Sequence, residues 1–246
     1  MKSDTTAVDM HALDLDWDSE FFGFKVVRIT HREVTAVQVD ITLRRLKGQG
    51  VRLAYWPLAS PLQPTDVERH GGRLVDRKTT FRLELNDTAD REDSTDSLVE
   101  PYSEFMSMHQ LEDLAVQSGA YSRFASDPQV PRGKCEQLYR MWIRQSVLRE
   151  NANEVLVIRQ KGSLLGVVTL GEKNGHGNIG LLAVDRSARG KGYGERLVGA
   201  AEGWFRRRNY SRAQVVTQGE NVAACRLYKK CGYRIEQVDY FYHFWL

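Results

Sequence analysis

The alternation of apolar and polar positions divides the second half of the chain into short strands and amphipathic helices. Three apolar runs, at 154–159, 164–171 and 179–184, are separated by polar turns and predict three antiparallel strands. Apolar residues then recur at helical spacing, at Leu197, Val198, Ala201, Trp204 and Phe205. A strand at 213–217, a helix at 221–230 and an aromatic strand at 238–245 complete the predicted order.

The first half predicts a smaller α/β unit followed by two helices. Strands are expected at 26–29, 51–55 and 73–85, the last because its side chains alternate. A helical pattern through Ile41, Leu43 and Leu46 ends near Gly48 and Gly50, and a short helix is expected near Val67. The aromatic stretch 17–23 and the proline-marked stretch 57–64 predict turns, and helices are expected at 108–118 and 135–149.

A polar, charged segment separates these two halves. Residues 86–96, NDTADREDSTD, contain no large apolar side chain, which is typical of a linker. The sequence therefore predicts an N-terminal α/β lobe at 1–86, a linker at 87–96 and a second domain at 97–246.

Composition and charge exclude several classes of protein. The 35 Lys and Arg against 32 Asp and Glu give a net charge of +3, too balanced for a nucleic-acid-binding surface. No apolar run approaches the roughly 20 residues that cross a bilayer, and the chain starts with polar residues, so we expect a cytoplasmic protein without membrane insertion. The cysteines Cys135, Cys225 and Cys231 form no CxxC pair, so neither a disulfide framework nor a metal site is expected.

The glycine-rich loop at 189–194, RGKGYG, is the strongest chemical signal in the chain. Its glycines allow close approach of a ligand, and the unpaired N–H groups at the start of the following helix attract anions. The cations Arg189 and Lys191 make a pyrophosphate the expected ligand. The loop lacks both the Lys-Ser/Thr of a Walker loop and the GxGxxG spacing of a dinucleotide-binding loop.

The Arg-x-x-Gly-x-Gly spacing, with the downstream segments 221–224 (NVAA) and 227–233 (LYKKCGY), resembles the GNAT superfamily of N-acetyltransferases over roughly the last third of the chain. The resemblance implies an α/β (α+β) fold of the GNAT type, in which helices flank a mixed central sheet. It also implies that the N-terminal lobe is a smaller, partial GNAT-like unit that carries substrate-side surface.

The resemblance further implies where acetyl-CoA, the acyl donor of the superfamily, would bind. The pantetheine arm would run along the central strand at Leu182, Ala183 and Val184, and a backbone N–H of this strand could hold the developing oxyanion. The pyrophosphate would be held by Arg189, Gly190, Lys191, Gly192, Tyr193 and Gly194. Asn221 would cap the next helix and also hydrogen-bond the donor.

The resemblance places Tyr228 beside the donor sulfur, and it is therefore the predicted general acid. Its reference pKa of about 10 lies above the roughly 8.5 of a thiol, so complete proton donation would be uphill by about 2 kcal/mol. We expect the hydroxyl to stabilise charge as it develops, with the proton following late. The alternative is a purely structural aromatic ring.

The acceptor is indicated by scattered stretches at 17–23, 72–76, 122–124 and 139–143. They resemble the dTDP-fucosamine acetyltransferases, which acetylate the 4-amino group of a dTDP-linked 4-amino-4,6-dideoxy sugar for surface polysaccharide. In that family the position of Asp76 carries a carboxylate facing the acceptor. Asp76 is therefore preferred to Glu172 as the base that organises a water, and the lone histidines His109, His176 and His243 are expected to be structural.

The sequence thus predicts an acetyl-CoA-dependent N-acetyltransferase of a nucleotide-linked amino sugar that transfers the acetyl group directly in a ternary complex. Cys225 and Cys231 lie near the donor segment but are expected to be small buried hydrophobes rather than nucleophiles. Acetylation of another small amine or a protein N-terminus, and a non-catalytic acyl-CoA-binding module, remain alternatives. The aromatic strand at 240–245 is either a sheet edge that forms a homodimer or part of the core.

Overall fold

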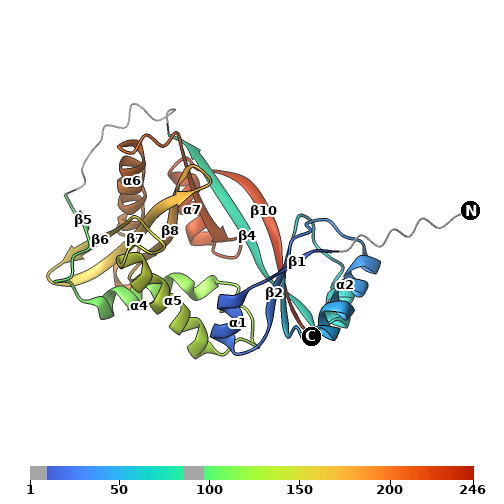
Figure 1. Cartoon of the computed structure of the whole chain (residues 1–246). Helices are drawn as coiled ribbons and strands as arrows, with labels where there is room; N and C mark the ends of the chain where they lie inside the picture. Colours follow the sequence, from blue (N-terminus) through green and yellow to red (C-terminus); the bar gives the residue numbers. More distant parts are fainter. Residues whose placement is uncertain (1–9, 86–96) are drawn as a thin grey trace, which may run out of the picture. The chain divides into compact units, whose positions relative to one another are not determined.

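The computed structural model describes residues 10–85 and 97–246, which form two compact units (Figure 1). Unit 1 comprises the chain up to Lys78 with Ser126–Gln129 and Val238–Leu246, and unit 2 comprises Thr79–Ala125 and Val130–Gln237. The predicted linker at 87–96 and the polar start of the chain lie outside the described residues. None of the helices in the described part has the length and apolar character that crossing a bilayer requires.

Unit 1 is a small sheet covered by a capped helix. Strand β1 (Ala12–Asp14) pairs antiparallel with β2 (Val26–Ile29), and β2 pairs parallel with β3 (Leu53–Leu58). Helix α2 (Ala36–Gly48) starts with a capping box between Thr35 and Gln38 and buries Val39, Leu43 and Leu46. A short helix, α3 (Pro64–Arg69), then leads into the long strand β4 (Gly72–Glu84), which continues into unit 2. The predicted strands and helices of this unit are therefore present.

The C-terminal strand β10 (Arg234–Trp245) lies inside the sheet. Its end, Tyr240–Trp245, pairs antiparallel with β3, and β4 is its other neighbour. Tyr242 and Phe244 are buried in the core of unit 1. The core interpretation of this aromatic strand is therefore correct and the edge interpretation is wrong. The pairing with β3 also explains why the last nine residues belong to unit 1 rather than to the second domain.

Of the two stretches predicted to be turns, 17–23 is a helix instead, whereas 57–64 is a turn between β3 and α3 except at its ends. Residues 17–23 form α1 (Asp16–Phe22), in which the rings of Trp17 and Phe21 stack at 5.2 Å one helical turn apart, and Gly23 ends the helix with a φ of 81°. Pro57 lies within β3, in register with Phe241. Because the pairing of β3 with β2 ends at Tyr55, Pro57 joins a ladder on one side only, where a proline is tolerated.

Unit 2 contains a mixed sheet in the order β4-β9-β8-β7-β6-β5. Strands β6 (Glu154–Gln160), β7 (Ser163–Lys173) and β8 (His176–Val184) are antiparallel, as predicted, and β9 (Arg212–Gln218) pairs parallel with β8. The short edge strand β5 (Val99–Pro101) was not predicted. Helices α4 (Met108–Ser118), α5 (Arg132–Val147), α6 (Tyr193–Arg206) and α7 (Val222–Lys230) confirm the predicted helices.

Helix α6 anchors the loop that precedes it. The five apolar residues predicted on one stripe, Leu197, Val198, Ala201, Trp204 and Phe205, are all buried in the core of unit 2, where α6 packs on β7 and β8. Burying a large apolar side chain contributes about 1.5–3 kcal/mol, so this stripe fixes the helix firmly on the sheet. The first turn of α6 is thereby held at the end of β8.

Candidate active site

The glycine loop connects β8 to α6 as an anion-binding turn. A single 3-10 turn, Arg186–Ala188, follows β8, and Gly190 and Gly192 then adopt φ values of 77° and 80°. These values lie in the left-handed region that side chains disfavour, which is why glycine occupies both positions. Gly192 is the N-cap of α6 and carries no capping side chain. The first N–H groups of α6 therefore have no partner within the helix and are available to a ligand.

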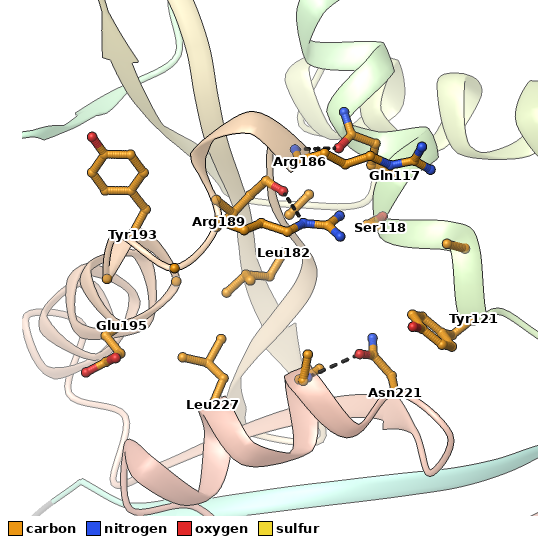
Figure 2. A pocket seen from close by; sticks show the side chains of 18 residues that line it. Gln117, Ser118, Tyr121, Leu182, Arg186, Arg189, Tyr193, Glu195, Asn221 and Leu227 are labelled. Atoms are coloured by element: carbon orange, nitrogen blue, oxygen red, sulfur yellow. Dashed lines mark hydrogen bonds between the residues drawn. The ribbon is translucent and has the colours of Figure 1, made fainter.

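The turn before the loop is held by its own polar side chains. Asp185 accepts hydrogen bonds from the backbone N–H and the hydroxyl of Ser187, at 2.9 and 2.5 Å. Arg189 Nε donates to the carbonyl oxygen of Val184, the last residue of β8, at 3.1 Å (Figure 2). Hydrogen bonds, first from the Ser187 hydroxyl and then from Gln117, lower the pKa of Asp185 to about 2. Asp185 is therefore ionised at any working pH.

Strands β8 and β9 separate beside this loop. Their parallel pairing covers Gly177–Ile179 and Ala213–Val215, so the last residues of β8 have no β9 partner within the described residues. On its other side, β8 has a register irregularity opposite Thr169, whose hydroxyl accepts a hydrogen bond from the Leu181 N–H at 2.8 Å. The divergence leaves backbone groups of residues 180–184 facing a gap between two strands of one sheet.

Helix α7 forms the opposite wall of this gap. Its N-cap is Asn221, whose side chain accepts a hydrogen bond from the Ala224 N–H at 3.1 Å, as the predicted cap requires. Ala223, Ala224 and Leu227 line the same cavity as the end of β8, and Figure 2 shows Leu227 on the side of α7 that faces Leu182. Small residues at the start of the helix leave space between α7 and β8.

These elements enclose a cavity of about 700 Å³ that lies entirely within unit 2. All the residues predicted to bind the acyl donor line it except Lys191. The sequence did not indicate the lining residues that come from α4 and the turn after it, nor the side chains of Arg186 and Glu195. The lining residues from α4 and the turn after it are Gln117, Ser118, Ala120 and Tyr121. No spacing in the sequence marked them, because they lie about 70 residues before the loop and meet it only through the fold.

Tyr228, the predicted general acid, is directed into the core rather than along the cavity wall. Its side chain is 4% exposed and packs against the rings of Phe81 and Tyr233 at 5.7 and 6.0 Å. Burial raises its pKa well above the ordinary value of a phenol. The hydroxyl is therefore neutral at physiological pH and can donate a hydrogen bond, while complete proton loss is costlier than for an exposed tyrosine.

The two candidate bases lie in different units. Asp76 is buried in the part of β4 that belongs to unit 1. Glu172, in unit 2, is exposed at the end of β7 and accepts a hydrogen bond from the Tyr210 hydroxyl at 2.8 Å. The role of Asp76 as the base remains a prediction. Among residues 10–85 and 97–246, no group of three or more His, Cys, Asp or Glu side chains is placed to hold a metal ion.

One polar cluster in unit 1 was not foreseen. His243 Nδ1 lies 2.6 Å from Asp127 Oδ2, and Trp245 Nε1 donates to the same oxygen at 2.9 Å. Burial alone would raise the pKa of Asp127, but the hydrogen bonds from His243 and Trp245 outweigh it and lower the pKa. The cluster fastens the segment Ser126–Gln129 to the last strand within unit 1, which is a structural role for His243.

Comparison with known proteins identifies the class to which this fold and cavity belong. Residues 119–233 match the family described as "Acetyltransferase (GNAT) family", and they span the cavity-lining loop and both helices beside it. A GCN5-related N-acetyltransferase from Sphaerobacter thermophilus has the same fold, with a TM-score of 0.58 and 15% sequence identity over 94% of this chain and 75% of that chain. Residues 119–233 are therefore a domain of the acetyltransferase (GNAT) family.

The chain is also similar in sequence to two named proteins. The chain is 28% identical over 231 residues to dTDP-fucosamine acetyltransferase of Escherichia coli O6:H1, covering 92% of this chain and 94% of that protein. It is also 27% identical over 133 residues to the spore coat polysaccharide biosynthesis protein SpsD of Bacillus subtilis, covering 54% of this chain and 46% of that protein. The resemblance predicted from the sequence is confirmed.

Proposed function

We propose that the protein transfers an acetyl group from acetyl-CoA to the amino group of a nucleotide-linked sugar, in the first instance a dTDP-linked 4-amino-4,6-dideoxy sugar. The similarity to dTDP-fucosamine acetyltransferase extends over nearly the whole of both chains, and it supports this choice of acceptor. The similarity to SpsD supports a role in polysaccharide synthesis. Cys135, Cys225 and Cys231 form no disulfide among the described residues, which fits an enzyme of a reducing, cytoplasmic compartment.

The separation of β8 from β9 is the observation that carries the proposal. An extended pantetheine arm can occupy the place of the missing strand and bond to the backbone of Leu182 and Val184, while its pyrophosphate meets the N–H groups of Gly192, Tyr193 and Gly194. The lining is partly apolar, from Leu182, Ala183, Ala224 and Leu227, which suits the hydrocarbon part of the arm. The cavity thus offers a strand backbone and an apolar lining for the pantetheine arm, and N–H groups for the pyrophosphate.

The reaction is a direct acyl transfer. The neutral amine nitrogen attacks the thioester carbonyl carbon, the carbon–sulfur bond breaks, and the nitrogen loses a proton while the thiolate of CoA gains one. A backbone N–H of β8 stabilises the oxyanion. The Tyr228 phenol, although it is buried and does not line the cavity, is the group proposed to hydrogen-bond the departing sulfur. Asp76 organises the water that removes the proton from the amine.

Release of free thiol from acetyl-CoA tests this function. The purified protein is supplied with acetyl-CoA and a panel of dTDP- and UDP-linked amino sugars, simple amines and an N-terminal peptide. We expect rapid thiol release with a dTDP-linked 4-amino sugar and slow release with the corresponding 4-hydroxy sugar, which lacks the nucleophile. Turnover with simple amines or the peptide alone would overturn the acceptor assignment. Binding of acetyl-CoA without release by any amine would instead indicate a non-catalytic module.

A further inference from the structure

Gln117, near the end of α4, makes two hydrogen bonds to the turn that follows β8. Its Nε2 donates to Asp185 Oδ2 at 3.0 Å. Its Oε1 accepts from the Arg186 N–H at 3.1 Å, the bond drawn in Figure 2. The side-chain amide of Gln117 therefore donates to one residue of the turn, Asp185, and accepts from the next, Arg186. This side chain therefore links the α4 side of the cavity to the anion-binding side.

The turn held by Gln117 carries the arginines that face the cavity. Arg186 and Arg189 both line it, and Figure 2 shows their side chains directed to the same side of the cavity as Gln117 and Ser118. Lys191, the second cation expected from the sequence, does not line the cavity. Guanidinium groups that line the same cavity attract an anion to it, so the direction of this turn affects where phosphates are held.

We propose that Gln117 is a positioning residue for the coenzyme, and that its amide sets the turn so that Arg186 and Arg189 face the phosphates of acetyl-CoA. The inference rests on the proposed binding of acetyl-CoA to this cavity. Because Gln117 also links α4 to the turn of the donor loop, we expect its substitution to weaken the affinity for acetyl-CoA more than it slows the chemical step.

The chemistry of the contact determines which substitutions are informative. A glutamate has the same shape, but its carboxylate cannot donate to Asp185, which is ionised with a pKa of about 2. Repulsion between the two carboxylates raises the pKa of the new one. When it is protonated, it regains a donor for Asp185 and an acceptor for Arg186 N–H.

Few other charged groups near Gln117 could affect the pH dependence of the glutamate variant. In the turn, the charged groups facing Gln117 are Asp185, Arg186 and Arg189. The nearest carboxylates on α4 itself, Glu112 and Asp113, are bound by Arg140 of α5 at 3.2 and 3.0 Å. A change in CoA binding between pH 5 and pH 8 that is specific to the glutamate variant therefore reports on the new carboxylate.

Calorimetric titration with CoA between pH 5 and pH 8 tests the proposal on wild type, Gln117→Glu and Gln117→Leu. At pH 8 we expect both variants to bind CoA about 5- to 20-fold more weakly than wild type. As the pH falls to 5, the ratio of the Kd of Gln117→Glu to that of wild type should approach one, whereas the ratio for Gln117→Leu stays constant. Comparison with wild type at each pH removes the titration of the phosphates of CoA.

Gln110→Leu is the matched control. Gln110 lies on the same helix and its Oε1 accepts from the Leu164 N–H at 2.7 Å, but it does not line the cavity. Its loss should lower the melting temperature without changing the Kd for CoA. A pH-independent ratio for Gln117→Glu, or equal weakening in Gln110→Leu, would overturn the positioning role. If wild type itself bound no CoA, the proposed function would fail instead.

Discussion

At the scale of single residues, burial determines what the Tyr228 phenol can contribute. Its raised pKa keeps the proton in place, so in the proposed mechanism the hydroxyl can act only as a hydrogen-bond donor to the sulfur. We predict that Tyr228→Phe lowers kcat at least tenfold, about 1.4 kcal/mol of transition-state stabilisation, and leaves the KM for acetyl-CoA nearly unchanged. Because the phenol does not ionise, the loss should be the same from pH 6 to pH 9. Steady-state kinetics across this range measures it.

Tyr233 provides the control for Tyr228. It packs beside Tyr228 in the same core, and its hydroxyl has no hydrogen-bond partner in the described part of the chain. Tyr233→Phe should therefore keep full activity and lose no stability, since it removes an unsatisfied polar group. An unchanged kcat in Tyr228→Phe would remove Tyr228 from the mechanism.

The left-handed backbone of Gly192 makes a second prediction at this scale. Gly192 has a φ of 80°, so a side chain at this position strains the backbone by about 1–2 kcal/mol. The loop can relieve this strain only by changing its conformation, which displaces the N–H groups proposed to bind the pyrophosphate. Gly192→Ala should therefore raise the KM for acetyl-CoA several-fold, as measured by donor titration. Gly199→Ala, within α6 and with open space at the position of a Cβ, should instead stabilise the protein by about 0.5–1 kcal/mol without changing KM. Equal KM values for both variants would contradict the role of the loop.

At the scale of elements, the irregularity in β8 depends on one hydroxyl from β7. Thr169 Oγ1 accepts from the Leu181 N–H, and a Cβ on Gly180 would approach this oxygen to 2.7 Å. The hydroxyl and the glycine together fix the strand immediately before the residues proposed to hold the pantetheine arm. The shape of β8 is therefore specified by side chains on the neighbouring strand as well as by its own.

Thr169→Val tests this support. The substitution keeps the shape but leaves the Leu181 N–H without an acceptor, which costs about 1–3 kcal/mol. We expect a lower melting temperature and a reduced kcat/KM for acetyl-CoA, while Thr169→Ser, which keeps the oxygen, should retain both. A valine variant as stable and active as the serine variant would show that the hydroxyl does not position the strand.

At the scale of the whole molecule, local signals predicted the elements and tertiary contacts determined the rest. The stripe on α6, the antiparallel strands β6 to β8 and the Asn221 cap follow from spacing and capping chemistry, and they were predictable. The helix α1 was missed because its aromatic residues are stabilised by stacking rather than by a buried stripe. Strands β1 and β5 are three residues each, too short to produce an alternation.

The candidate site also contains residues that local sequence signals predicted and features that only tertiary contacts determine. The loop residues are contiguous and carry a glycine pattern, so they could be found from the sequence. Gln117 and Arg186 could not, because their importance depends on two hydrogen bonds across the fold. Nor could the separation of β8 from β9, since pairing that stops partway along a strand leaves no local signature.

A crystal structure of the protein soaked with acetyl-CoA tests the central claim most directly, because it locates the donor. The account predicts phosphate oxygens about 3 Å from the backbone nitrogens of Gly192 to Gly194, and a pantetheine arm bonded to Leu182 and Val184. Phosphates bound elsewhere on the protein, with the gap between β8 and β9 empty, would contradict it.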